Sequence, residues 1–69
     1  MYTVHFCSNI ESDNGLYSYT AIGSKEQVIE GARIKSMQIP MLKYKEWIVL
    51  LKLDGKTVAT RTIKEAKII

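Results

Sequence analysis

The chain has 69 residues, 46% of them hydrophobic, so it is long enough for one small domain, residues 1–69, and no more. Its single cysteine excludes an internal disulfide. One cysteine and one histidine together are too few for the four ligands of a closed zinc site. The net charge of +3 is unevenly divided: residues 1–31 carry one base against four carboxylates, whereas residues 32–69 carry nine against three.

The first part of the chain predicts two strands, over residues 2–9 and 16–22. Apolar and polar side chains alternate along both segments, which is the period-2 pattern of a half-buried strand. No lysine or arginine shares the apolar face, so its aromatic side chains are better suited to core packing than to stacking on bases. This face comprises Tyr2, Val4, Phe6, Ile10, Tyr17, Tyr19 and Ala21.

A two-residue turn signal, Asn14-Gly15, lies between these strands. A tight turn at this point would pair Ile10 with Tyr19. A longer loop over residues 9–15 is the alternative, and the sequence leaves both open.

A helix over residues 25–36 follows Gly23. Ser24 and Gln27 have the spacing of a capping box, in which each side chain accepts the backbone N–H of the other residue. Pro40 requires the helix to have ended before it. The buried stripe of this helix is predicted to be Val28, Ile29, Ala32 and Ser36.

Residues 43–53 and 56–63 predict a second hairpin about Asp54-Gly55, a strong signal for a two-residue turn whose central residues have positive φ. Uninterrupted pairing from this turn would place Leu51 opposite Val58. The expected core face of the hairpin holds Trp47, Val49, Leu51, Leu53 and Val58.

The other face of this hairpin is the predicted partner-binding strip, in which an apolar centre is bordered by positive charge, as in protein-docking surfaces. The same strip would suit the seam of a homodimer. The tail, residues 64–69, either extends the last strand or folds back to cover the strip. The strip comprises Ile48, Leu50, Lys52, Arg61 and Ile63.

Direct binding of nucleic acid by the basic second half of the chain is the alternative function. Against it stands the simpler interpretation that lysines solubilise strand edges and discourage edge-to-edge pairing. The residues that would contact phosphates are Lys43, Lys45, Lys52, Lys56, Arg61 and Lys64.

Catalysis, a metal site and a cofactor are not expected. His5 and Cys7 lie two apart and project from the same face of a strand, but no third group orients them, so they are interpreted as ordinary strand residues. No export signal precedes them and no apolar run is long enough to cross a membrane, so we expect a cytoplasmic protein.

The predicted fold is α+β: a four-stranded, mainly antiparallel sheet in the order 2-1-3-4, with one helix packed on one face (ββαββ). This outline resembles many small phage and mobile-element proteins, among them compact anti-CRISPR inhibitors, although no diagnostic motif accompanies it. The resemblance implies a non-enzymatic protein that regulates or inhibits a larger partner, such as a complex that handles nucleic acid.

Overall fold

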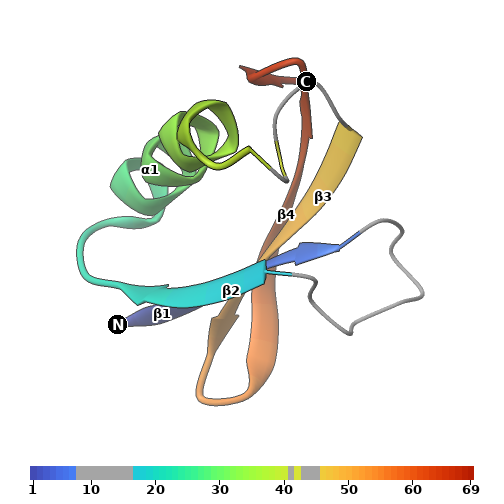
Figure 1. Ribbon diagram of the computed structural model, residues 1–69. Coiled ribbons are helices and arrows are strands. Elements are labelled where there is room, and N and C mark those ends of the chain that lie inside the picture. The colour runs from blue at the N-terminus through green and yellow to red at the C-terminus, as the bar shows by residue number, and fades with distance from the viewer. Residues whose placement is uncertain (8–16, 41, 43–45) are drawn as a thin grey trace.

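Five strands and one helix make up the part of the chain that the computed structural model describes, residues 1–7, 17–40, 42 and 46–69 (Figure 1). The sheet is antiparallel throughout, in the order β2-β1-β3-β4-β5. The predicted order of the first four strands is therefore confirmed, whereas the prediction of four strands is wrong because a fifth is added. The elements are β1 (Tyr2–Cys7), β2 (Tyr17–Ala21), α1 (Lys25–Gln38), β3 (Glu46–Leu53), β4 (Lys56–Lys64) and β5 (Lys67–Ile68).

Helix α1 begins with the predicted capping box. Gln27 N donates to Ser24 Oγ at 3.2 Å, and Ser24 N donates to Gln27 Oε1 at 2.9 Å. Gly23 precedes the cap with a φ of 141°, a conformation that favours glycine, and a Cβ there would lie 2.9 Å from Gln27 Oε1. The helix continues two residues beyond the predicted end, to Gln38, and Pro40 follows it.

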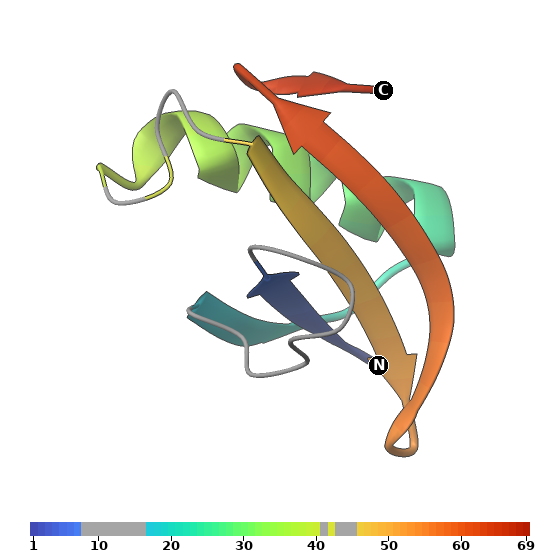
Figure 2. The same ribbon diagram turned by 90° about the vertical axis from the view of Figure 1, so that its right-hand side faces the viewer.

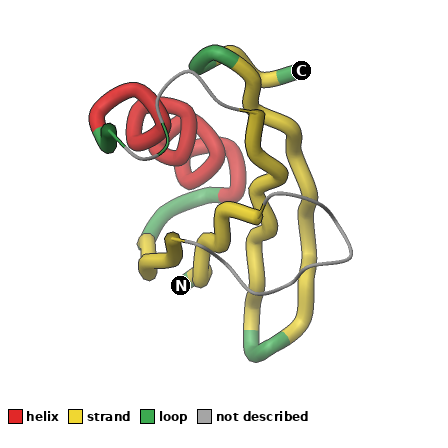
Figure 3. Tube along the Cα trace, turned by 45° about the vertical axis from the view of Figure 1, so that its right-hand side comes forward, coloured by secondary structure: helices red, strands yellow, loops and turns green. Residues whose placement is uncertain are grey.

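The predicted helix stripe is confirmed, since Val28, Ile29, Ala32 and Ser36 are its buried residues. The buried hydroxyl of Ser36 is satisfied because its Oγ donates to Arg33 O at 2.6 Å. Figure 3 shows the helix lying along one side of the strands. One face of the sheet is thus covered by α1, as the sequence predicts.

The pairing of β1 with β2 differs from a tight turn at Asn14-Gly15, because Tyr19 lies opposite Val4 rather than Ile10. The longer-loop alternative is the one that fits this register. The turn itself and Ile10 lie outside the described residues. The apolar face is nevertheless unchanged in its described members, since the two registers differ by an even number of residues and side chains alternate with a period of two.

The second hairpin turns where the sequence predicts. Asp54 and Gly55 have φ values of 52° and 80°, the two positive angles of a type I′ turn. Beyond the turn, however, the register changes by one residue: Lys52 lies opposite Thr57, but Leu51 lies opposite Ala59. The extra residue on β4 is Val58, which forms a β-bulge.

The bulge exchanges the two faces of β4. Trp47 now lies opposite Ile63, which is fully buried, whereas Val58 is 43% exposed. The expected core position of Val58 is therefore wrong, as is the expected position of Ile63 on the other face. The expected core position of Leu53 is wrong too, because this residue of β3 is 39% exposed. Uninterrupted pairing would have put Thr62 in the core, so the bulge replaces a costly buried hydroxyl with an isoleucine worth about 2 kcal/mol of burial.

The tail folds back instead of extending β4. Glu65 and Ala66, both with positive φ, reverse the chain, and β5 then pairs with the end of β4 so that Ile68 lies opposite Ile63. Ile68 is therefore on the helix face by register, and Ile69 is 75% exposed. Neither alternative holds in full: the tail folds back, as the second expects, but it pairs as an edge strand and does not cover the predicted strip.

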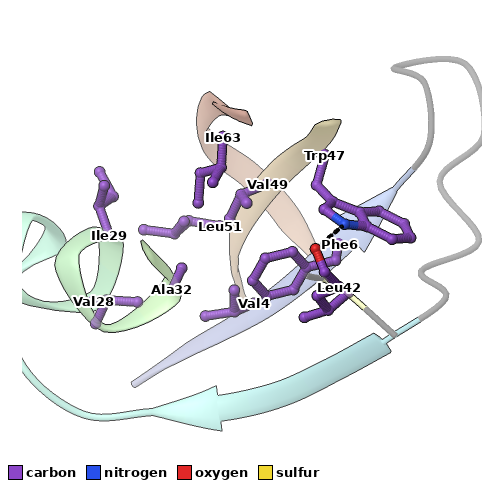
Figure 4. Packing of buried hydrophobic residues seen from close by; sticks show 10 residues of the cluster. All are labelled: Val4, Phe6, Val28, Ile29, Ala32, Leu42, Trp47, Val49, Leu51 and Ile63. Atoms are coloured by element: carbon purple, nitrogen blue, oxygen red, sulfur yellow. Dashed lines mark hydrogen bonds between the residues drawn. The ribbon is translucent and has the colours of Figure 1, made fainter. Parts of the chain in front are cut away.

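The core lies between α1 and the sheet (Figure 4). Three helix residues point toward β1, β3 and β4, and Leu42, which follows the helix, closes the other end beside Trp47. The Trp47 indole Nε1 donates to Leu42 O at 3.0 Å, so the buried tryptophan is both packed and hydrogen-bonded. The core residues are Val4, Phe6, Val28, Ile29, Ala32, Leu42, Trp47, Val49, Leu51 and Ile63.

Candidate functional site

The predicted partner-binding strip does not form one exposed surface. Ile63 is in the core, and Arg61 lies opposite Val49 on the helix face, where its Nη1 donates to Thr60 O at 2.8 Å. The one-residue shift at the bulge moves both residues off the predicted face. Ile48, Leu50 and Lys52 remain on the face opposite the helix, where their β4 neighbours are threonines (Thr62, Thr60 and Thr57) instead of Arg61 and Ile63.

The face opposite the helix is polar and partly closed. Leu50, at its centre, is only 4% exposed, so it is no part of an open apolar strip. Ile48 and Lys52 on either side of it are half-buried. The other described side chains that register places on this face are Thr3, His5, Cys7, Ser18, Thr20, Glu46, Thr57, Thr60, Thr62, Lys64 and Lys67.

His5 and Cys7 lie on this face, as the alternation predicts. His5 is half-buried between Ser18 and Leu50, and Cys7 is fully buried opposite Ile48. Within the described ranges no group of three or more histidine, cysteine, aspartate or glutamate side chains is placed to hold a metal ion.

The cations of the nucleic-acid alternative are spread along the β3–β4 hairpin. Lys56 is at the turn, Arg61 is on the helix face, and Lys64 is at the opposite end, with its Nζ 4.0 Å from Glu46 Oε2. Eight strand residues separate the two ends by about 23 Å at the rise of a β-strand. The four described cations, Lys52, Lys56, Arg61 and Lys64, therefore do not converge on one patch. Lys43 and Lys45 lie outside the described residues.

Exposed apolar side chains instead gather where the hairpin projects beyond β1. Leu53 and Val58 are 39% and 43% exposed, and Figures 1 and 2 show the β3–β4 turn extending past the rest of the sheet. Met1 and Ile22 lie at the same end, one residue beyond the last pair of β1 and β2, and are 73% and 86% exposed. We call Leu53, Val58, Met1 and Ile22, with Lys52 and Lys56, the hairpin-tip surface.

Sequence reasoning missed this surface because it assigned Leu53 and Val58 to the core face of the hairpin. β3 and β4 have eight and nine residues, but β1 has six and its pairing with β3 ends at Thr3 opposite Lys52. Among the described residues, no strand pairs with β3 beyond Lys52 to cover Leu53 and Val58. One signal was available in the sequence: the adjacent apolar residues Val58 and Ala59 break the alternation of the strand.

A cluster of aromatic rings surrounds Phe6 on the helix face. Tyr17, Tyr19 and Trp47 lie with their ring centroids 6.1, 6.5 and 6.4 Å from that of Phe6. Lys35 of α1 places its Nζ 5.1 Å from the centroid of Tyr19, within cation–π range. These rings pack against the core, as predicted, although both tyrosines remain half-exposed.

The Tyr19 hydroxyl is buried and finds no hydrogen-bond partner among the residues that the structure describes. This burial, with a smaller contribution from Tyr17, raises the pKa of Tyr19 to about 12. A buried hydroxyl without a partner costs folding free energy, because water would have satisfied it in the unfolded chain.

Replacing Tyr19 with phenylalanine is therefore expected to stabilise the protein by about 1 kcal/mol. In the native protein the unfolded chain loses the Tyr19 proton near pH 10 and the folded chain only near pH 12, so stability falls between these values. Tyr19→Phe should remove that fall. Urea unfolding of both proteins below pH 10 and above it measures the difference, with Tyr17→Phe as the control. A loss of stability in Tyr19→Phe below pH 10 would contradict this assignment.

The outer face of α1 carries an ordered arginine. Arg33 Nε and Nη2 donate to Glu30 Oε1 at 2.8 and 2.6 Å, and Nη1 lies 3.4 Å from Met37 Sδ. The hydrogen bonds from Arg33 lower the pKa of the Glu30 carboxyl. Ile34 and Met37 are exposed on this helix, at 39% and 45%, as expected for residues outside the buried stripe.

No protein-family model, curated protein or solved structure matches this chain. Across the described part of the chain, the one helix is too short and too polar to span a bilayer.

Proposed function

We propose that this chain is a non-enzymatic binding protein that regulates or inhibits a larger protein by docking through the hairpin-tip surface. The supporting observation is the placement of its exposed apolar side chains. Leu53, Val58, Ile22 and Met1 are exposed at the same end of the sheet. Exposed apolar side chains that gather in one place with a polar rim are typical of protein interaction sites.

The charges beside this surface define the partner further. Lys56 is exposed at the turn and Lys52 is half-buried beside it, whereas Asp54 is the one carboxylate of the turn. The excess of positive charge favours a partner whose apolar patch is bordered by carboxylates. The resemblance to phage and mobile-element inhibitors extends the proposal to partners that handle nucleic acid, and that extension rests on the outline of the fold alone.

Direct binding of nucleic acid is the second candidate. Its supporting observation is the exposure of Lys56, Lys64 and Lys67 in the basic half of the chain. The two candidates differ in their response to salt. Phosphate contacts release counterions, so affinity falls steeply and linearly with log salt concentration, whereas apolar docking changes little.

The test is affinity capture from cells that express the chain, with the captured proteins quantified by mass spectrometry at low and high salt. Leu53→Glu/Val58→Glu should reduce capture of the partner by about tenfold or more, because charge is introduced into the apolar centre. The matched control is Ile34→Glu/Met37→Glu, which adds the same charge at residues of similar exposure on α1. The control should capture the partner as the native chain does.

Capture that survives Leu53→Glu/Val58→Glu, or that disappears equally in the helix control, would contradict docking at the hairpin tip. Titration of labelled single- and double-stranded oligonucleotides against salt tests the second candidate. A steep salt dependence that is weakened by Lys56→Gln/Lys64→Gln, together with no captured protein, would favour direct nucleic-acid binding instead.

A further inference from the structure

The two outer edges of the sheet differ in how they are protected. The β4 edge contains the bulge at Val58, carries Lys56 and Arg61, and is capped at its far end by β5. Bulges, charged side chains and short covering strands are the devices by which proteins prevent unwanted pairing at an edge. The β4 edge is therefore protected against pairing with a strand of another molecule.

Within residues 17–21 and the other described elements, the β2 edge has none of these devices. Residues Tyr17–Ala21 (YSYTA) contain no charge, proline or glycine, and the strand pairs with β1 in an unbroken register of five residues. No other described element pairs with its outer side, and Figure 2 shows β2 at the margin of the sheet. Its outward backbone N–H and C=O groups are thus a template for a further strand.

We propose that this edge pairs with β2 of a second copy of the chain, in antiparallel register about Tyr19, to join two five-stranded sheets into one. A two-fold axis perpendicular to the sheet keeps the same face of both copies on the same side. Residues that lie opposite one another must then both be odd-numbered or both be even-numbered. The axis therefore passes midway between the two copies of one residue. Only an axis at Tyr19 uses all five residues.

The side chains of β2 are complementary to themselves in this register. Tyr17 lies opposite Ala21 of the second copy, and Ser18 lies opposite Thr20. The apolar pairs fall on the helix face, where Tyr17 and Tyr19 are half-exposed in the single chain and would gain cover. The polar pairs fall on the opposite face, where Ser18 and Thr20 are exposed and can form cross-strand hydrogen bonds.

A second copy is chosen over a peptide from another protein because this register puts the large Tyr17 opposite the small Ala21, and no charged residue of β2 faces its own copy across the axis. Lys35 of α1 brings a charge near the axis, because its Nζ lies 5.1 Å from the centroid of the Tyr19 ring. This inference uses neither Leu53 nor Val58 and stands independently of the proposed function.

Two double variants of exposed β2 residues test the pairing. Ser18→Lys/Thr20→Lys places two pairs of like charges directly opposite one another and should weaken the dimer by about tenfold or more. Ser18→Lys/Thr20→Glu places lysine opposite glutamate in both pairs and should preserve the dimer. Thr57→Lys/Thr60→Lys is the control, because it adds the same charge at exposed residues of β4.

Sedimentation velocity over a range of concentrations measures the dissociation constant of each protein, and circular dichroism verifies that each is folded. The native chain and the β4 control should dimerise equally. A native chain that remains monomeric at every concentration would overturn the proposal, even if another protein's peptide binds β2. Equal dimerisation of the native chain and Ser18→Lys/Thr20→Lys would also overturn it. Dissociation of Ser18→Lys/Thr20→Glu would overturn the register.

Discussion

Replacing Trp47 with alanine is expected to lower the free energy of unfolding by about 3 kcal/mol or more. The side chain is 4% exposed, and its ring meets that of Phe6 edge-on at 6.4 Å. Its Nε1 also donates to Leu42 O, so the truncation both opens a cavity and leaves a buried carbonyl unpaired.

The measurement is urea denaturation followed by circular dichroism. A domain of this size is stable by only a few kcal/mol, so Trp47→Ala is best compared in a stabilised background. Gly31→Ala supplies one: a Cβ at Gly31 meets nothing within 4 Å, and alanine within a helix is favoured over glycine by about 1 kcal/mol. Trp47→Phe separates the ring from the hydrogen bond. A loss below about 1 kcal/mol for Trp47→Ala would contradict its place in the core.

Ile63→Ala is expected to cost about 2–4 kcal/mol, whereas Val58→Ala should cost less than about 1 kcal/mol. The two residues lie on the same strand, but Ile63 is fully buried and Val58 is 43% exposed. Uninterrupted pairing beyond Asp54-Gly55 would give the opposite ranking, because it would place Val58 in the core opposite Leu51. The pair of variants therefore tests the bulge.

Chemical denaturation of both variants, with hydrogen exchange of the β4 amides, provides the measurement. Part of the loss in Ile63→Ala could come from the pairing with β5, because Ile68 lies opposite Ile63. Ile68→Ala, at a residue 38% exposed, serves as the control for that contact and should cost little. A Val58→Ala loss as large as that of Ile63→Ala would be inconsistent with a bulge at this position.

On β4, substitutions that lower stability should therefore be at different residues from those that weaken binding. Val58 contributes little to folding in the structure, and the proposed function assigns it to the hairpin-tip surface. Ile63, which the sequence assigned to binding, contributes to the core. The one-residue shift thus exchanges the expected roles of the two apolar residues of this strand.

Much of the fold could be predicted from local signals. The capping box of Ser24 and Gln27, the buried helix stripe and the turn at Asp54-Gly55 all depend on residues close together in the chain. The predicted binding strip could not be obtained in the same way. Its assignment required the pairing of β3 with β4 to remain regular for the whole hairpin, which no local signal guarantees.

In both hairpins the predicted register is wrong, but only in the second does the error change the sheet face on which the side chains lie. In the first, Tyr19 pairs with Val4 instead of Ile10, an even displacement, so every described side chain keeps its face. In the second, the bulge displaces β4 by a single residue, and Ile63 changes places with Thr62.

The amino-acid sequence by itself determined the turn at Asp54-Gly55, which segment is helical and which described residues of β1, β2, β3 and α1 are apolar on one side. Only the tertiary structure decided which side of β4 faces α1 and how far the β3–β4 hairpin projects. The physical reason is that turns and caps are stabilised by neighbours in sequence, whereas the bulge is stabilised by Ile63 entering a core made by distant segments.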